Sequence, residues 1–92
     1  MSLALDEFRA ILIRKILNAS SQEEVTRCIE KAMADIEKKK VNGHIIVRFV
    51  DKINGQLDLF SPLKKDAQEW SNINMARILF TRIKNKLVTT AI

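Results

Sequence analysis

The fold class is decided by residues 44–60, which read HIIVRFVDKINGQLDLF. Residues 44–52 are rich in β-branched and aromatic side chains, and residues 56–60 alternate polar and apolar side chains, as half-buried strands do. Between them, Ile53-Asn54-Gly55 carries a strong turn signal. The stretch therefore predicts a two-stranded antiparallel β-hairpin.

The register of this hairpin depends on the length of its turn. A two-residue Asn54-Gly55 turn would set Asp51 opposite Asp58, which brings like charges together. A three-residue loop with the glycine in the left-handed conformation places Phe49 opposite Leu59 instead. Because one buried face fixes strand register, we expect the second arrangement. It collects on one face Ile45, Val47, Phe49, Leu57 and Leu59.

Two helices are predicted before the hairpin. Residues 4–18 repeat apolar side chains at helical spacing and present an unusually wide apolar surface. Ser20 or Ser21, followed three residues later by a glutamate, forms a capping box that starts the second helix. That helix runs to about Lys40 along one apolar stripe, and Asn42-Gly43 ends it. The short connection between the two helices predicts an antiparallel helical hairpin.

A third helix is predicted after the hairpin, beginning at Ser61-Pro62. Its early apolar residues, up to Trp70, share one face, and its apolar residues from Ile73 onward share a face rotated by more than a quarter turn. We therefore expect a kink or break near Ser71-Asn72, or a helix that packs on two sides. Residues 88–92 are expected to fray.

The predicted order is α-α-β-β-α, an α+β fold in a single domain that spans residues 1–92. A lone hairpin is marginal in water and leaves both of its edges open. Strand pairing across a two-fold axis would cover those edges, so we also expect a homodimer with a four-stranded sheet.

The composition is that of a small basic globular domain. The chain has 92 residues, a formal net charge of +5 and 47% hydrophobic residues. No stretch reaches the roughly 18 apolar residues that span a bilayer, and the first residues lack the pattern of a secretory signal. The single cysteine excludes an internal disulfide and favours a reducing compartment. We therefore expect a soluble cytoplasmic protein.

The sequence predicts no enzyme, no cofactor and no metal site. His44 stands at a strand end with no carboxylate at a spacing that would orient it as a general base. Cys28 lies on the apolar stripe of the second helix, where a small buried hydrophobe is the expected role. Asp51 and Asp58 could approach each other across the hairpin, but we interpret them as surface charges because no third ligand is suitably spaced.

The basic residues occur in loose groups that would suit phosphate contacts only if they converged on one surface. One group closes the second helix, at Lys38-Lys39-Lys40, and another opens the third, at Lys64-Lys65. The candidate nucleic-acid-binding residues are Lys38, Lys64, Arg77, Arg82, Lys84 and Lys86.

Residues 56–60, Gln56-Leu57-Asp58-Leu59-Phe60, resemble the pentapeptide with which many bacterial replication and repair proteins bind the DNA sliding clamp. The usual form of that motif is Gln-Leu-Ser/Asp-Leu-Phe, and all five positions agree. In that family the glutamine and the apolar residues enter pockets on the clamp while the peptide lies extended. The resemblance thus implies a clamp-binding role for these five residues, through capture of a free extended segment.

Two functions follow from these features. The wide apolar helix, the open hairpin edges and the lack of a catalytic set favour a non-catalytic protein-interaction or assembly module, with a protein partner or a second copy. The alternative is a basic nucleic-acid-associated accessory protein that binds the sliding clamp through residues 56–60.

Overall fold

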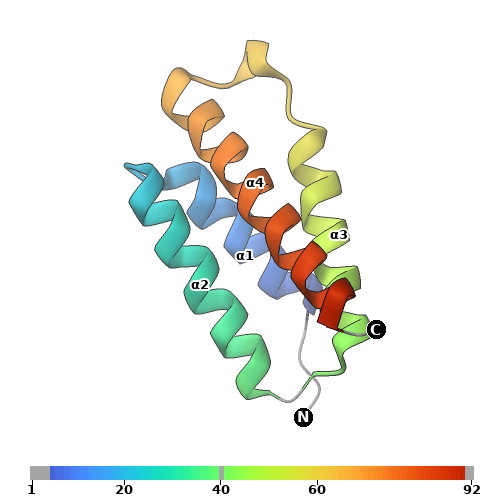
Figure 1. Cartoon of the computed structure of the whole chain (residues 1–92). Coiled ribbons are helices and arrows are strands. Elements are labelled where there is room, and N and C mark those ends of the chain that lie inside the picture. The colour runs from blue at the N-terminus through green and yellow to red at the C-terminus, as the bar shows by residue number, and fades with distance from the viewer. Residues whose placement is uncertain (1–4, 40, 91–92) are drawn as a thin grey trace.

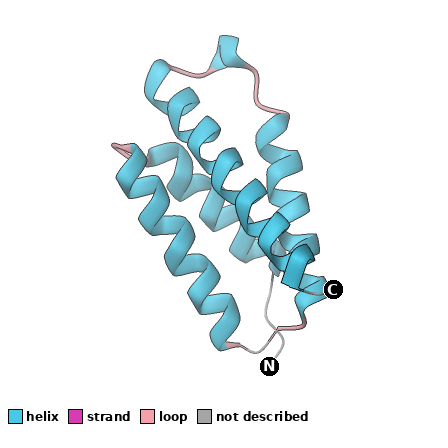
Figure 2. Cartoon of the chain, in the orientation of Figure 1, coloured by secondary structure: helices cyan, strands magenta, loops and turns pink. Residues whose placement is uncertain are grey.

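Residues 44–60 form no hairpin, and the α+β prediction is wrong. In the computed structural model, residues 5–39 and 41–90 are described, with only the backbone given for residues 62, 89 and 90. Throughout this part of the chain every regular element is a helix, and no strand is present (Figure 2). The order is α1 (Leu5–Asn18), α2 (Gln22–Lys38), α3 (Gly43–Asp58), a short 3-10 turn η1 (Pro62–Lys64) and α4 (Ala67–Thr90).

Helix α3 replaces both predicted strands because its apolar residues also fit the helical period. The buried ones recur at steps of three and four: Ile46, Phe49, Val50, Ile53 and Leu57. Asn42 caps the start, since its Oδ1 accepts from the backbone N–H of His44 at 2.8 Å. Tertiary packing along this stripe overrides the local preference of β-branched residues for strands. Ile45 and Leu59, which the strand register would have buried, are exposed.

Asn54 and Gly55 lie inside α3 rather than in a turn. A Cβ added at Gly55 would meet no atom within 4 Å, so the glycine is not required by any close approach. Without strands in the described residues there are no strand edges to pair, and the dimer through a four-stranded sheet is also wrong.

The predicted helical hairpin is present, formed by α1 and α2 (Figure 1). The cap at the start of α2 uses Ser21 and Glu24. The Ser21 hydroxyl accepts from the Glu24 backbone N–H at 3.2 Å, and the Glu24 carboxylate accepts from the backbone N–H of Ser20 at 2.7 Å. Two otherwise unpaired amides are thereby satisfied. Ala4 and Lys40, at the predicted outer ends of these helices, lie outside the described residues.

The four helices form a bundle in which α4 lies across α1, with α2 on one side and α3 on the other (Figure 1). Successive helices run in opposite directions, and α2 and α3 sit at the far corners of the bundle. Helix α4 therefore contacts all three of the others. This arrangement is the second of the two predicted for the C-terminal helix, in which it packs on more than one side.

The predicted kink or break near Ser71-Asn72 is wrong, and the C-terminal helix does not begin at Ser61-Pro62. Ser61 caps η1, accepting from the Leu63 N–H at 3.3 Å, and the chain is extended at Lys65. Helix α4 then starts at Ala67 and continues through Ser71-Asn72 without interruption. It reaches Thr90, beyond the start of the predicted frayed segment; residues 91 and 92 lie outside the described part.

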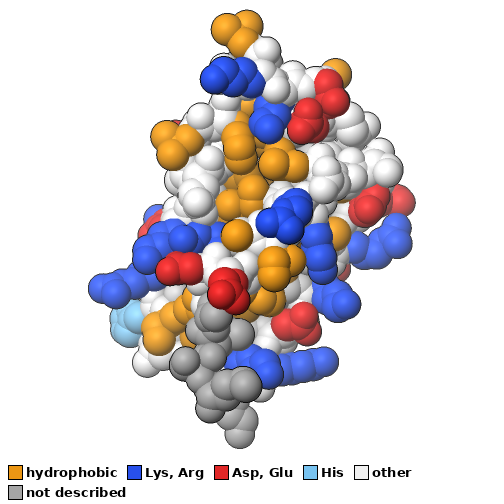
Figure 3. All heavy atoms as spheres, turned by 180° about the vertical axis from the view of Figure 1, so that it is seen from behind, with side chains coloured by type: hydrophobic (Ala, Val, Ile, Leu, Met, Phe, Trp, Pro, Cys, Tyr) orange, Lys and Arg blue, Asp and Glu red, His pale blue; other side chains and the backbone are white. Residues whose placement is uncertain are grey.

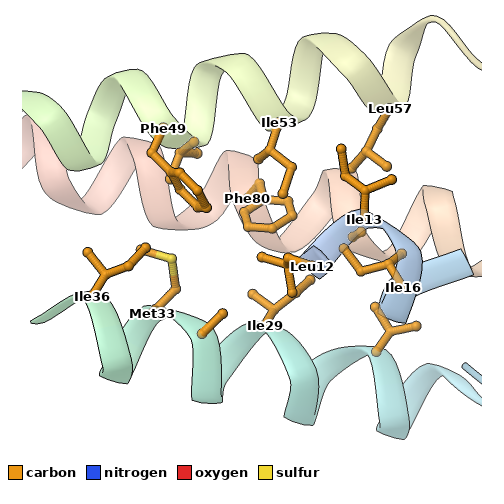
Figure 4. Close-up of a cluster of buried hydrophobic side chains, with 14 of the residues drawn as sticks. Leu12, Ile13, Ile16, Ile29, Met33, Ile36, Phe49, Ile53, Leu57 and Phe80 are labelled. Atoms are coloured by element: carbon orange, nitrogen blue, oxygen red, sulfur yellow. The ribbon is translucent and has the colours of Figure 1, made fainter. Parts of the chain in front are cut away.

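One core fills the bundle, with buried side chains from all four helices. Figure 4 shows Phe80 of α4 among side chains from α1, α2 and α3. The Phe80 side chain is fully buried, as are Ile16, Ile29 and Ile53, one from each of the other helices. Burying such side chains stabilises a fold by about 1.5–3 kcal/mol each.

A buried amide ties the α1–α2 connection to α4. Asn72 is 0% exposed, and its Nδ2 donates to the carbonyl of Ala19 at 2.8 Å. Its Oδ1 accepts from Gln68 at 2.9 Å, so both ends of the amide are bonded. This bond fixes the end of the helical hairpin against the start of α4.

Candidate functional site

Arg77 and Lys84, which were predicted to contact nucleic acid, form ion pairs within the fold. Arg77 pairs with Asp58 at 2.9 Å, and Lys84 pairs with Asp51 at 2.6 Å. Both pairs join α4 to α3. Asp51 and Asp58 thus lie on one helix, each beside its own cation, and do not approach each other as they would across a hairpin.

The other candidate cations do not converge. Lys38 ends α2 and Lys64 lies in η1, which are opposite ends of the bundle (Figure 1). Arg82 lies on the outer face of α4, where it lines a shallow hollow of about 550 Å³ beside Ile78. Lys86 is exposed further along α4. The six predicted residues therefore make no single basic surface.

The clamp-like pentapeptide occupies the last turn of α3 and the residues after it. Gln56 accepts a hydrogen bond from Arg9 at 2.7 Å, and Leu57 is 1% exposed. Leu59 is 83% exposed, whereas the Phe60 ring is half-buried with the Lys65 Nζ 4.8 Å from its centroid. An extended presentation of all five residues would require the end of α3 to unwind and Leu57 to leave the core.

No catalytic or metal-binding cluster is formed by the residues singled out from the sequence. His44 is exposed in the first turn of α3. Cys28 is half-buried rather than buried, at the boundary between α1 and α2. Across the described residues, His, Cys, Asp and Glu side chains nowhere gather in a group of three that could hold a metal ion.

A concave surface lies along the α1–α2 hairpin. A pocket of about 130 Å³ opens between the two helices, with Phe8, Ile11 and Leu12 on one side and Cys28 and Ala32 on the other. It continues toward the hairpin loop as a hollow of about 630 Å³ and toward the end of α2 as one of about 510 Å³. Because neighbouring hollows share lining residues, we treat them as one feature, the α1–α2 groove.

The floor of the α1–α2 groove is apolar and its rims are basic. Ile11, near its middle, is 49% exposed. The rims carry six cations, namely Arg14, Lys15, Arg27, Lys31, Lys38 and Lys39. Among the described residues that line it, the carboxylates are those of Glu24 and Asp35, and the first accepts a hydrogen bond from the Ser20 backbone N–H. Figure 3, which looks onto the α1 side, shows apolar side chains along the middle, with Lys and Arg and also Asp and Glu side chains around them.

A second apolar feature stands at the end of the bundle, in the connection from α3 to α4. Leu59 is 83% exposed and Leu63 is 96% exposed. Figure 3 shows apolar side chains standing out at this end of the molecule. Two leucines four residues apart make only a small patch.

Sequence reasoning missed the α1–α2 groove because it treated the basic residues of the two helices separately. The short connection between α1 and α2 contains the necessary information, because it fixes which residues of the two helices are neighbours. It places Arg14-Lys15 of α1 near Arg27 and Lys31 of α2. The same register sets Ile11 beside Cys28. The interpretation of Cys28 as a small buried hydrophobe hid this relationship.

None of the described helices is both long enough and apolar enough to cross a lipid bilayer. Comparison of the chain with protein-family models, with curated proteins and with solved structures finds no match.

Proposed function

We propose that this protein is a non-catalytic protein-interaction module whose docking surface is the α1–α2 groove. The observation that carries the proposal is the exposed Ile11 on the apolar floor of a groove that follows the length of the hairpin. Single exposed apolar residues are ordinary on protein surfaces. An apolar strip inside a concave surface is different, since a partner that fills it releases water from both sides.

A protein partner fits this groove better than a nucleic acid does. Nucleic-acid surfaces contact phosphates with cations and stack bases on accessible aromatic rings. Here the aromatic ring of the groove, Phe8, packs against Phe49 with ring centroids 5.8 Å apart. Two of the cations predicted to contact phosphate, Arg77 and Lys84, already pair with carboxylates. An apolar floor contributes little to binding a phosphate backbone.

Selection from a phage-displayed library of helical peptides tests the proposal. The matched variants are Ile11→Glu in the groove and Ile78→Glu on the outer face of α4, since Ile78 is 50% exposed and Ile11 is 49% exposed. Peptides selected on the native protein should bind the Ile78 variant unchanged. They should bind the Ile11 variant at least about tenfold more weakly, as truncation of a central contact does.

Other outcomes would contradict the proposal. Selected peptides that bind both isoleucine variants equally would show that the groove is not the docking surface. Binders that respond instead to Leu63→Ser would move the surface to the end of the bundle. A library that yields no binder at all would remove helical-peptide docking as the function.

A further inference from the structure

We infer that the occupant of the α1–α2 groove is an acidic amphipathic helix from a partner protein. This inference rests on the proposed function and adds the chemistry of the partner. It predicts a helix with apolar side chains on one face and carboxylates along both edges of that face.

The shape of the groove sets the form of the occupant. The hairpin that bounds it includes the 14 residues of α1 and the 17 residues of α2. At about 1.5 Å per residue, α1 is roughly 20 Å long, which matches about four turns of a docked helix. A third helix can lie in the furrow between two antiparallel helices at the usual interaxial distance of about 8–10 Å. Its apolar residues would then contact Phe8, Ile11 and Cys28 along one line.

The charges of the groove set the chemistry of the occupant. Arg14 and Lys15 stand on the α1 rim, and Arg27 and Lys31 stand on the α2 rim. None of these four groove cations takes part in the ion pairs found among the described residues, which engage Arg9, Lys65, Arg77 and Lys84. The groove cations therefore remain available to an incoming carboxylate from either side. Such flanking pairs speed association and fix orientation, while the apolar contacts hold the complex.

The basic rims and the apolar floor of the groove together restrict which partner helices can bind. A basic helix would be repelled by both rims, and an acidic segment without apolar residues would leave Ile11 in contact with water. The occupant must satisfy both conditions, which defines the probes for the experiment.

The probes are three fluorescein-labelled peptides of about 16 residues, four turns of helix. All three carry leucines at the repeated helical spacing i, i+3, i+4, i+7. The remaining positions are all glutamate in the first peptide, all glutamine in the second and all lysine in the third. Fluorescence anisotropy should show the glutamate peptide binding at least about tenfold more tightly than the glutamine peptide at low salt, with a difference that shrinks as salt rises. The lysine peptide should not bind.

Matched double variants locate the binding. Lys15→Glu with Lys31→Glu reverses one cation on each rim, and Arg48→Glu with Lys52→Glu makes the same net change on the exposed side of α3. The groove variant should lose the preference for the glutamate peptide, and the α3 variant should keep it. Circular dichroism of all variants verifies that each retains its helical fold.

Three results would overturn the inference, and they separate it from the proposed function. Equal binding of the glutamate and glutamine peptides, weakened by Ile11→Glu, would retain groove docking and remove the acidic partner. No binding by any of the three peptides, together with a failed library selection, would remove both. A labelled DNA duplex that binds more tightly than the glutamate peptide, and is lost in the groove double variant, would assign the surface to nucleic acid.

Discussion

Asp51 and Lys84 form an ion pair between α3 and α4, with 2.6 Å between the Asp51 Oδ1 and the Lys84 Nζ. The Asp58–Arg77 pair, at 2.9 Å, repeats the link seven residues later in α3 and seven residues earlier in α4. Equal steps in opposite directions are what an antiparallel helix pair requires, because both helices turn once every 3.6 residues or so. The two pairs therefore mark the register of α3 against α4.

These ion pairs should contribute little to stability. All four side chains are substantially exposed. A double-mutant cycle with Asp51→Asn and Lys84→Met should give a coupling energy of at most about 1 kcal/mol, which decreases with added salt. Urea unfolding of the single and double variants measures it, with Lys52→Met as a control at an exposed lysine of α3, next to Asp51 in sequence. A coupling energy above about 2 kcal/mol would show that the pairs hold the bundle together.

Leu57 and Leu59 should respond differently to truncation. Leu57 is 1% exposed within the core, whereas Leu59 is 83% exposed. Leu57→Ala should lower the free energy of unfolding by about 2–5 kcal/mol through lost contacts and an added cavity. Leu59→Ala should change it by less than about 0.5 kcal/mol. Denaturant unfolding measures both variants. Similar losses in the free energy of unfolding at the two positions would contradict a helix that buries Leu57 and exposes Leu59.

Gly55→Ala should stabilise the protein. Gly55 lies in the interior of α3, where an added methyl group would meet no atom within 4 Å. Alanine is favoured over glycine in a helix by about 0.8–1 kcal/mol, partly because glycine loses more backbone freedom on folding. Thermal unfolding should therefore show a higher Tm. A lower Tm would indicate a turn in which Gly55 adopts a conformation that alanine resists.

Asn72→Ala should destabilise the protein, because Asn72 is a buried polar residue whose amide is hydrogen-bonded. The substitution leaves the carbonyl of buried Ala19 without its donor, which costs about 1–3 kcal/mol in the free energy of unfolding. Asn74→Ala is the matched control, since Asn74 is exposed on the same helix. Equal stabilities of the two variants in urea would mean that the bond to Ala19 is dispensable.

The sequence predicts the α1–α2 hairpin because its signals agree. Helical spacing, the short connection and the Ser21 cap all indicate two antiparallel helices. Residues 44–60 carry two periods at once, one of two residues and one of three to four. Local preferences favoured the strand pattern, and the cap at Asn42 together with the packing of Ile53 and Leu57 in a common core favours the helix. That core is built by all four helices, so no local window contains the deciding information.

The groove could be predicted less well than the fold. The sequence gives the residues of each helix, but the groove depends on which side chains of the two helices face the same surface. For Arg14, Lys15, Arg27 and Lys31 that follows only from the hairpin register. The prediction of strands for residues 44–60 also hid the ion pairs of Arg77 and Lys84. In a hairpin, their partners Asp58 and Asp51 would lie on two different strands rather than along one helix.

The contact of α4 with all three other helices has a consequence for the newly made chain. The folded bundle joins residues far apart in sequence, such as Ala19 and Asn72. At synthesis rates of about 5–20 residues per second, roughly 3–10 s separate the end of α2 from the end of α4. During that interval Ile29 and Ile36 have no α4 to cover them. A ribosome-bound chain is therefore most open to chaperones and to aggregation in the seconds before α4 emerges.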